Sequence, residues 1–256
     1  MSSYLTICEE AARAAGRILE QWRGKFSIRE KGRADLVTEA DLAAQNEIQR
    51  ILLEAYPEFN FLGEESFPGE PLTDSPFRWI VDPLDGTTNY IHGLPNYSIS
   101  IALEEAGQII AGVVYDPVFD RCYKASHGNG AWMNGERLQV AGAEYLKDAL
   151  VAASFAANIT KDSPEIRHFV DILTEARGIR RLGSAALNLA YVAAGHLDGY
   201  WAGSNKAWDV AAGVILVEEA GGVVRGYDSQ PFDLQAPKIV ATGTPQLQAE
   251  IQARLI

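Results

Sequence analysis

The sequence predicts an α+β protein that is built from two lobes. Three apolar segments within residues 97–126 are separated by turn residues, which is typical of an antiparallel meander. The second half instead alternates strand-like and helix-like segments. Hydrophobic residues make up 47% of the 256 residues, enough to bury a sizeable core. We expect the lobes, residues 1–145 and 146–256, to form one compact unit, since no low-complexity linker or repeat separates them.

The first half begins with two predicted helices. The first covers residues 4–22, whose apolar positions recur at helical spacing: Leu5, Cys8, Ala12, Ala15, Ile18, Leu19 and Trp22. The second begins near Thr38, because the sequence TEAD has the form of a capping box with Asp41 as its acidic member. Strands are expected around Phe59–Leu62 and Phe77–Val81, ahead of the meander.

The second half continues this alternation to the end of the chain. We expect strands at residues 150–155, 179–183, 197–202, 223–226 and 238–242. Helices are expected at residues 164–176, 184–194, 207–220 and from about 244 onward. Ser184 is placed to cap its helix, because its hydroxyl can accept a bond from a free backbone N–H group.

Composition excludes several classes of function. The formal net charge of −12 argues against nucleic acid as a direct partner, since that affinity rests on basic contacts to phosphate. No stretch approaches the roughly 20 apolar residues of a membrane span, and the first residues lack a secretory pattern. Two cysteines provide neither a disulfide framework nor metal-ligand spacing, which predicts a cytoplasmic protein. A small anion can still bind where metal ions reverse the local field.

The stretch WIVDPLDGTTNYIHG, residues 79–93, places two aspartates directly after an apolar strand. A surface turn is one interpretation, since Asp-Gly is common in hairpins. However, no alternating return strand follows, and a proline removes a backbone donor that pairing would need. The alternative is that the strand delivers Asp82 and Asp85 to a ligand site. Gly86 then leaves room for the ligand, and Thr87 opens a short helix whose N–H groups face an anion.

Further carboxylates stand in two other segments. Glu64 and Glu65 follow an apolar strand in NFLGEES, and Asp209 begins the apolar helix of WDVAAGVILVEEAGG. Taken separately, these are equally well read as a solvated acidic turn and a helix-capping residue. Adjacent carboxylates repel unless a cation lies between them, and carboxylate oxygens suit Mg²⁺. The combination predicts a Mg²⁺ site that clamps a phosphate for transfer to water.

In this order and at these separations, GEES, WIVDPLDGTTNY and WDVAAGVILVEEAGG resemble the inositol monophosphatase family of metal-dependent, lithium-sensitive phosphatases. The resemblance covers essentially the whole chain. It implies a layered α-β-α-β-α sandwich, a homodimer, and hydrolysis of a small phosphorylated metabolite without a membrane or nucleic-acid partner.

The resemblance also implies a ligand set for two to three Mg²⁺ ions. Glu64, Asp82 and the backbone carbonyl of Leu84 would bind the first ion. Asp82, Asp85 and Asp209 would bind the second, and a third, weaker ion would contact Glu64 mostly through water. By the same resemblance, Mn²⁺ can replace Mg²⁺, whereas Ca²⁺ and Li⁺ inhibit.

Roles in catalysis and substrate binding follow from the same resemblance. Glu64 and the hydroxyl of Thr87 would orient the attacking water, and Asp41 would support that hydroxyl. Backbone N–H groups of Gly86 and Thr87 would hold the phosphate. The remaining positions are Asp85, Ser184 and Ala202 as substrate contacts, and Lys31 and Asp35 on a mobile loop that closes over the metals.

The substrate itself is less well defined by the sequence. Family members that hydrolyse inositol phosphates usually carry glutamate seven residues before the last metal aspartate, where this chain has Ala202. Inositol-1-phosphate is the leading candidate; histidinol phosphate, fructose 1,6-bisphosphate and 3′-phosphonucleotides are alternatives. Arg180 and Arg181 either meet the non-reacting side of a substrate or form a solvated strand end. His92 either lines the mouth of the site or is an ordinary loop residue. The rival class, a non-catalytic regulatory protein, is disfavoured because no expected metal ligand is missing.

Overall fold

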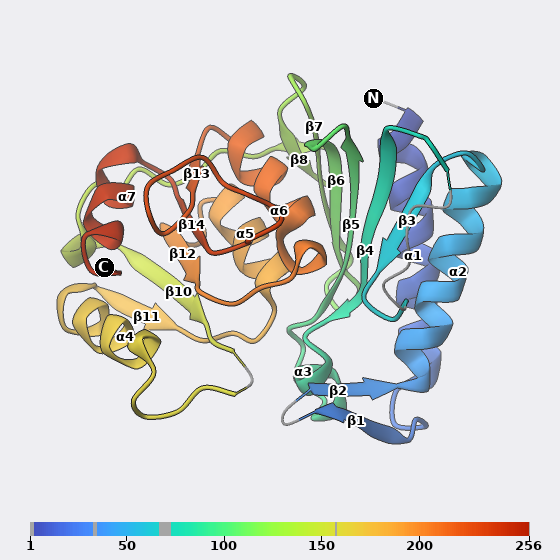
Figure 1. Ribbon diagram of the computed structural model, residues 1–256, viewed down its shortest axis with the longest axis horizontal. Helices are drawn as coiled ribbons and strands as arrows, with labels where there is room; N and C mark the ends of the chain where they lie inside the picture. Colours follow the sequence, from blue (N-terminus) through green and yellow to red (C-terminus); the bar gives the residue numbers. More distant parts are fainter. Residues whose placement is uncertain (1–2, 33–34, 67–72, 157, 256) are drawn as a thin grey trace.

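The structure, a computed structural model, describes residues 3–32, 35–66, 73–156 and 158–255, and within residues 28–37 only the backbone is described. Across these ranges, helices and sheets form five layers (Figure 1). The predicted α-β-α-β-α sandwich is confirmed. No helix in the described ranges has both the length and the apolar character needed to cross a membrane.

The larger sheet contains seven strands within the described part of the chain. In spatial order they are β3 (Asn60–Gly63), β4 (Phe77–Asp85), β5 (Ser98–Glu105), β6 (Gln108–Asp116), β7 (Arg121–Ser126), β8 (Ala131–Met133) and β9 (Glu136–Arg137). Strand β3 runs parallel to β4, and every later pair is antiparallel. The predicted meander therefore forms the centre of this sheet.

The smaller sheet has five strands among the described residues. Their order is β11 (Gly178–Arg180), β10 (Leu150–Ser154), β12 (Gly199–Ala202), β14 (Ile239–Thr242) and β13 (Val223–Arg225). Strand β10 is parallel to both of its neighbours, whereas β14 is antiparallel to both of its own. The sheet is therefore mixed.

Helices occupy the two outer layers and the layer between the sheets (Figure 1). One outer layer is α1 (Ser3–Trp22) with α2 (Glu39–Ala55), and the other is α4 (Pro164–Glu175) with α7 (Pro245–Gln252). The middle layer is α5 (Ala185–Ala193) with α6 (Ala207–Glu219). Two short helices are η1 (Leu146–Asp148) and α3 (Thr87–Ile91).

Alternation along the strands distributes apolar side chains between the layers. In β4, Trp79 and Val81 pack toward α1 and α2, whereas Ile80 packs in the cluster that contains α5 and α6. In β12, Tyr200 joins that same middle cluster, and Trp201 faces the cluster under α4 and α7. Each strand therefore buries side chains on both of its faces.

Several predicted elements differ from the structure in extent. Strand β4 was expected to end at Val81 but runs to Asp85, with an irregular register against β5 between Asp82 and Asp85. The proline between them cannot donate to the ladder, which accounts for the break in pairing. The expected loop around Lys31 and Asp35 is instead an antiparallel hairpin of β1 (Ile28–Gly32) and β2 (Asp35–Thr38). The side chains of Lys31 and Asp35 lie outside the described residues.

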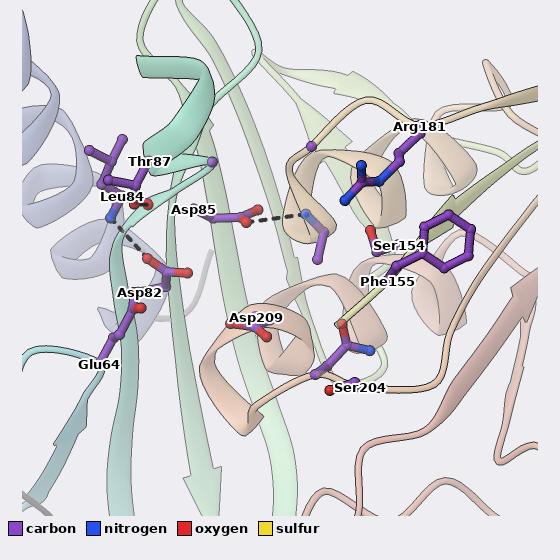
Figure 2. A pocket seen from close by; sticks show the side chains of 14 residues that line it. Glu64, Asp82, Leu84, Asp85, Thr87, Ser154, Phe155, Arg181, Ser204 and Asp209 are labelled. Carbon is purple, nitrogen blue, oxygen red and sulfur yellow. Dashed lines mark hydrogen bonds between the residues drawn. The ribbon is translucent and has the colours of Figure 1, made fainter. Parts of the chain in front are cut away.

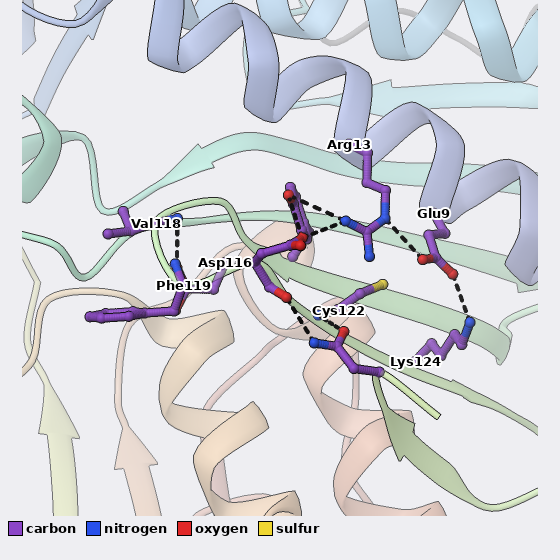
Figure 3. A network of polar contacts seen from close by, with 10 residues as sticks. Glu9, Arg13, Asp116, Val118, Phe119, Cys122 and Lys124 are labelled. Atoms are coloured by element: carbon purple, nitrogen blue, oxygen red, sulfur yellow. Dashed lines mark hydrogen bonds and ion pairs between the residues drawn. The ribbon is translucent and has the colours of Figure 1, made fainter. Parts of the chain in front are cut away.

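Charged side chains tie α1 to β7 on the face away from the middle layer. Lys124 on β7 donates to Glu9 on α1 at 2.6 Å, and Arg13 donates to the same carboxylate at 2.9 Å (Figure 3). Arg13 also pairs with Asp120 in the turn before β7. These ion pairs fix the outer helix relative to the sheet that carries the acidic residues of interest.

Candidate active site

One cavity of about 220 Å³ gathers most of the residues that the sequence singles out. Its acidic part is formed by Glu64 after β3, by Asp82 and Asp85 on β4, and by Asp209 on α6 (Figure 2). The other described residues that line it are Leu84, Gly86, Thr87, Ser154, Phe155, Arg181, Gly183, Ala185, Ser204 and Asn205. Segments from both sheets and from the middle helix layer therefore meet at this cavity.

Parallel pairing of β3 with β4 places Glu64 beside Asp82. Gly63 is in register with Val81, and the backbone N–H of Glu64 donates to the carbonyl of Val81 at 3.1 Å. The next residue of each strand therefore lies at the same edge of the sheet. Asp82 is only 2% exposed, and its Oδ1 accepts the backbone N–H of Leu84 at 2.9 Å.

The first turn of α5 holds the carboxylate of Asp85. The hydroxyl of Ser184 donates to it at 2.5 Å, and the backbone N–H groups of Ala185 and Ala186 donate at 3.2 and 2.7 Å. Ser184 also caps α5 by accepting the N–H of Leu187 at 3.1 Å, as predicted. The free N–H groups and positive end of this helix stabilise a negative charge on Asp85.

Asp209 occupies the first turn of α6. Its Oδ2 accepts the backbone N–H of Lys206 at 2.7 Å, so the carboxylate caps the helix on which it stands. This confirms the helix-capping interpretation of Asp209. The same half-buried side chain also lines the cavity, so capping and ligand binding are compatible at this position.

Burial and mutual repulsion raise the pKa values of these carboxyl groups. Burial raises the pKa of Asp82 well above its usual range, and the charges of Glu64, Asp85 and Asp209 add to the effect. Burial raises the pKa of Asp85 to about 6, although Ser184 and α5 oppose the shift. The pKa of Asp209 is raised to about 7, again mainly by burial. A cation bound between these carboxylates would relieve this repulsion.

A further buried carboxylate, that of Asp41, lies beneath the turn that follows β4. Asp41, 1% exposed, accepts the N–H and hydroxyl of Thr38 at 2.9 and 2.5 Å, which confirms the predicted capping box. The hydroxyl of Thr87 donates to the Leu84 carbonyl at 3.1 Å and lies 3.4 Å from Asp41 Oδ1. Burial raises the pKa of Asp41 to about 6.

Gly86 joins β4 to α3 in a backbone conformation that favours glycine. Its φ is +99°, in the left-handed region. A Cβ atom there would also lie 3.0 Å from the carbonyl oxygen of Asn96 and 3.3 Å from that of Gly183. The predicted helix does open at Thr87, directly after this residue. The absence of a side chain keeps the backbone at the cavity surface accessible.

The carboxylate and carbonyl oxygens at the cavity are ligands of the kind that a hard divalent cation prefers. In this structure they do not surround a single ion position. Asp82 Oδ2 and Asp209 Oδ1 make no hydrogen bond to another described residue, and Leu84, whose carbonyl accepts the Thr87 hydroxyl, also lines the cavity. Nevertheless, no three His, Cys, Asp or Glu side chains of the described chain are close enough to hold one ion. Asp85 is turned toward α5 (Figure 2). For three of these carboxylates to bind one ion, they would have to lie closer together than they do here.

Of the other residues that the sequence proposes for the site, the structure places some at the cavity and others away from its described lining. Ser184 lies behind Asp85 and is fully buried. Ala202 is also fully buried and is not among the described residues that line the cavity. Arg181 lines the cavity; Arg180 and His92 do not appear among its described lining residues.

Sequence reasoning missed part of the cavity wall. These residues are Ser154 and Phe155 at the end of β10, Gly183 and Ala185 around the start of α5, and Ser204 and Asn205 after β12. Their position at or just after the ends of the predicted strands 150–155, 179–183 and 197–202 is the signal that could have identified them, because ligands bind beyond the carboxyl ends of parallel strands.

Comparisons with known proteins agree with this geometry. The model of the inositol monophosphatase family matches residues 1–255. An "Inositol-1-monophosphatase" of Mesorhizobium japonicum is 43% identical over 249 residues, which cover 94% of this chain and 91% of the relative. A "Fructose-1,6-bisphosphatase/inositol-1-monophosphatase" of Aquifex aeolicus is 38% identical over 87% of this chain and 85% of its own length. The solved structure of the extragenic suppressor protein suhB from Bartonella henselae has a TM-score of 0.93 at 39% identity, covering 99% of this chain and 98% of the other.

Proposed function

Since the chain belongs to the inositol monophosphatase family, whose members are phosphoric monoester hydrolases, we propose that it hydrolyses a small phosphate monoester with Mg²⁺. The observation that carries the proposal is the convergence of Glu64, Asp82, Asp85 and Asp209 on one cavity beside Gly86. The relatives' names favour inositol-1-phosphate as substrate, with fructose 1,6-bisphosphate as an alternative that one of them names. Histidinol phosphate and 3′-phosphonucleotides are further alternatives on the same scaffold.

In this proposal the carboxylates share two to three Mg²⁺ ions. Glu64, Asp82 and the carbonyl of Leu84 would hold the first, and Asp82, Asp85 and Asp209 the second; a third would contact Glu64 through water. When bound, Mg²⁺ supplies Lewis-acid activation of water and neutralises charge on the phosphate. The raised pKa values of Asp82, Asp85 and Asp209 support this assignment, because a cation would relieve the repulsion that contributes to them. Mn²⁺ would substitute for Mg²⁺, whereas Ca²⁺ and Li⁺ would inhibit.

The chain itself would position the reactants. Backbone N–H groups of Gly86 and Thr87 would bind phosphate oxygens at the accessible turn after β4. Glu64 and the Thr87 hydroxyl would orient the attacking water for in-line displacement of the alcohol. Asp41 supports the hydroxyl from below, 3.4 Å away, and its own two bonds to Thr38 keep it in place. Proximity and orientation of this kind account for a large share of the rate in phosphoryl transfer.

The proposal is tested by phosphate release from a panel of esters, with and without Mg²⁺, alongside calorimetric titration of Mg²⁺. The Asp209→Asn variant should lose both Mg²⁺ affinity and phosphate release, because it removes a ligand charge while keeping the helix cap. A matched control is Asp148→Asn, an exposed aspartate that pairs with Arg177 outside the cavity. Metal-independent release, or equal Mg²⁺ affinity in Asp209→Asn and the parent, would contradict the proposal.

A second role through a protein partner is favoured by the likeness to the suhB structure, which is named as a suppressor protein rather than as a hydrolase. The two roles separate in a complementation experiment. A suhB deletion strain that expresses the Asp85→Asn variant should recover the wild-type phenotype if the partner-dependent role does not require hydrolysis. Loss of rescue in parallel with loss of phosphate release would assign the phenotype to the hydrolase.

A homodimer is also part of the proposal, supported by the family resemblance. Sedimentation equilibrium should yield about twice the chain mass of 27.9 kDa. A concentration-independent mass near that of one chain would contradict it.

A further inference from the structure

The cavity has two chemically different walls (Figure 2). Glu64, Asp82 and Asp85 lie on the wall supplied by the larger sheet. The opposite wall carries Phe155, Arg181, Ser154 and Ser204 (Figure 2), and Asn205, which directly follows Ser204, also lines the cavity; none of these five residues is acidic. If the first wall receives the reacting phosphate, the second faces the rest of the substrate.

Arg181 is the single cationic side chain among the described residues that line the cavity. Its side chain is exposed, and no carboxylate of the described chain lies within ion-pair distance of it. Its guanidinium carbon lies 5.4 Å from the centre of the Phe155 ring. Stacking on an aromatic face orients the guanidinium while leaving its N–H groups available for a ligand.

The same wall lacks the group that a neutral polyol would need. Sugar and inositol hydroxyls are held best by charged acceptors such as carboxylates. Ala202, the last residue of β12 and two positions before Ser204, is fully buried behind the described lining and has no polar side chain. Asn205 directs its amide N–H to the carbonyl of Pro237 at 3.2 Å. A guanidinium in this setting matches planar or tetrahedral oxyanions, which it can bind through two parallel hydrogen bonds.

We propose that Arg181 is a specificity residue that binds a second anionic group, phosphate or carboxylate, on the non-reacting side of the substrate. This inference rests on the proposed phosphatase function and narrows its substrate class. Esters with a second anionic group are then processed with higher kcat/KM than esters whose remainder is neutral. The net charge of −12 strengthens the requirement for Arg181, since a doubly anionic substrate is otherwise repelled.

The test compares matched esters with the Mg²⁺-loaded, full-length enzyme. Glycerol 1-phosphate and 3-phosphoglycerate differ by a hydroxymethyl group against a carboxylate. Fructose 1-phosphate and fructose 1,6-bisphosphate differ by a second phosphate. For at least one pair, we expect kcat/KM to favour the more anionic ester by about 10-fold or more, the range of a hydrogen bond to a charged group. The pair that responds identifies which anion is recognised.

Variants then assign the preference to one side chain. Arg181→Gln should lower the preference ratio by about 10-fold or more, and Arg181→Lys should keep part of it, because the charge remains while the two-pronged geometry is lost. Arg180→Gln is the matched control: Arg180 is exposed and donates to the carbonyl of its neighbour Ile179 at 3.0 Å. It should leave the ratio unchanged.

The outcomes separate this inference from the proposed function. Phosphate release without any preference for the more anionic esters, or a preference that survives Arg181→Gln, overturns the role of Arg181 and leaves the phosphatase proposal intact. An equal loss of preference in Arg180→Gln also overturns it. No Mg²⁺-dependent release from any of the four esters or from p-nitrophenyl phosphate overturns the proposed function, and the inference with it.

Discussion

Stability of the metal-free protein should fall as the pH rises from 5 to 8. The carboxyl groups of Asp85 and Asp209 have pKa values of about 6 and about 7 in the folded chain, against a usual value of 3.8. The folded state therefore binds more protons than the unfolded state across this range. By linkage, the free energy of unfolding decreases with rising pH wherever the folded state binds more protons.

The size of this decrease in the free energy of unfolding follows from the same pKa shifts. Each pKa unit corresponds to about 1.4 kcal/mol. Between pH 5 and the two folded-state pKa values, Asp85 contributes a loss of about 1 kcal/mol and Asp209 a loss of about 3 kcal/mol. Asp41, whose pKa is also about 6, adds to the loss. The pKa of His168 is lowered by burial, so that histidine opposes the trend over the lower part of the window.

The assay is urea unfolding in EDTA at pH 5, 6, 7 and 8, followed by circular dichroism. The Asp209→Asn variant removes the contribution of Asp209 together with its repulsion of Asp82, whereas the contributions of His168 and Asp41 are common to both proteins and cancel in the difference. It should remove about 3 kcal/mol of the pH-dependent loss. Asp148→Asn, on the exposed surface, should remove none. Saturating Mg²⁺ should remove the part of the slope that Asp82, Asp85 and Asp209 contribute, since the ions neutralise these repelling carboxylates, and should leave the contributions of Asp41 and His168.

Two results would refute the reasoning. The first is a free energy of unfolding in EDTA that stays level or rises between pH 5 and 8. The second is a stabilisation by Mg²⁺ that is as large at pH 5 as at pH 8. Either result would show that the buried carboxylates do not repel one another in the way from which the metal site is inferred.

Three further substitutions test separate parts of the site. Asp85→Asn should lower phosphate release by several orders of magnitude while circular dichroism stays unchanged, because it removes one charge from the second ion's ligand set; near-parental turnover would rule out that ligand role. Ser184→Ala should cost about 1 kcal/mol of stability through the lost helix cap, and about 10-fold in Mg²⁺ affinity because Asp85 is held less firmly. The control Thr244→Ala, which removes the cap of α7, should lower stability alone. Equal Mg²⁺ affinities in Ser184→Ala and the parent would refute the coupling. Gly86→Ala should cost about 2 kcal/mol in thermal unfolding, because its φ of +99° is strained for any L side chain; an unchanged melting temperature would contradict this.

Local signals in the sequence predicted most elements of the fold. The capping box at Thr38 and Asp41 and the cap at Ser184 were readable because their bonds join residues at most three positions apart. Strand β10 and the middle helices α5 and α6 were readable from their apolar pattern. The hairpin of β1 and β2 was missed, since its short and polar strands carry no such pattern.

Long-range contacts were beyond sequence reasoning. Asp85 was recognised as a functional residue, but its contact with the first turn of α5 joins groups 99 to 101 positions apart. The stacking of Arg181 on Phe155 likewise depends on how β10 and β11 pair. The continuation of β4 from Val81 to Asp85 also required the structure, because it depends on the pairing of Asp82 and Asp85 with Ser100 and Ser98 of β5.

The central claim is that separate carboxylates converge to hold divalent cations beside a phosphate. The most direct measurement is anomalous scattering from crystals grown with Mn²⁺ and inorganic phosphate. We predict one Mn²⁺ peak among Glu64, Asp82 and the Leu84 carbonyl, and a second among Asp82, Asp85 and Asp209, with phosphate at Gly86 and Thr87. Full Mn²⁺ occupancy elsewhere, with Asp85 still held by α5 and no peak in this cavity, would contradict the account.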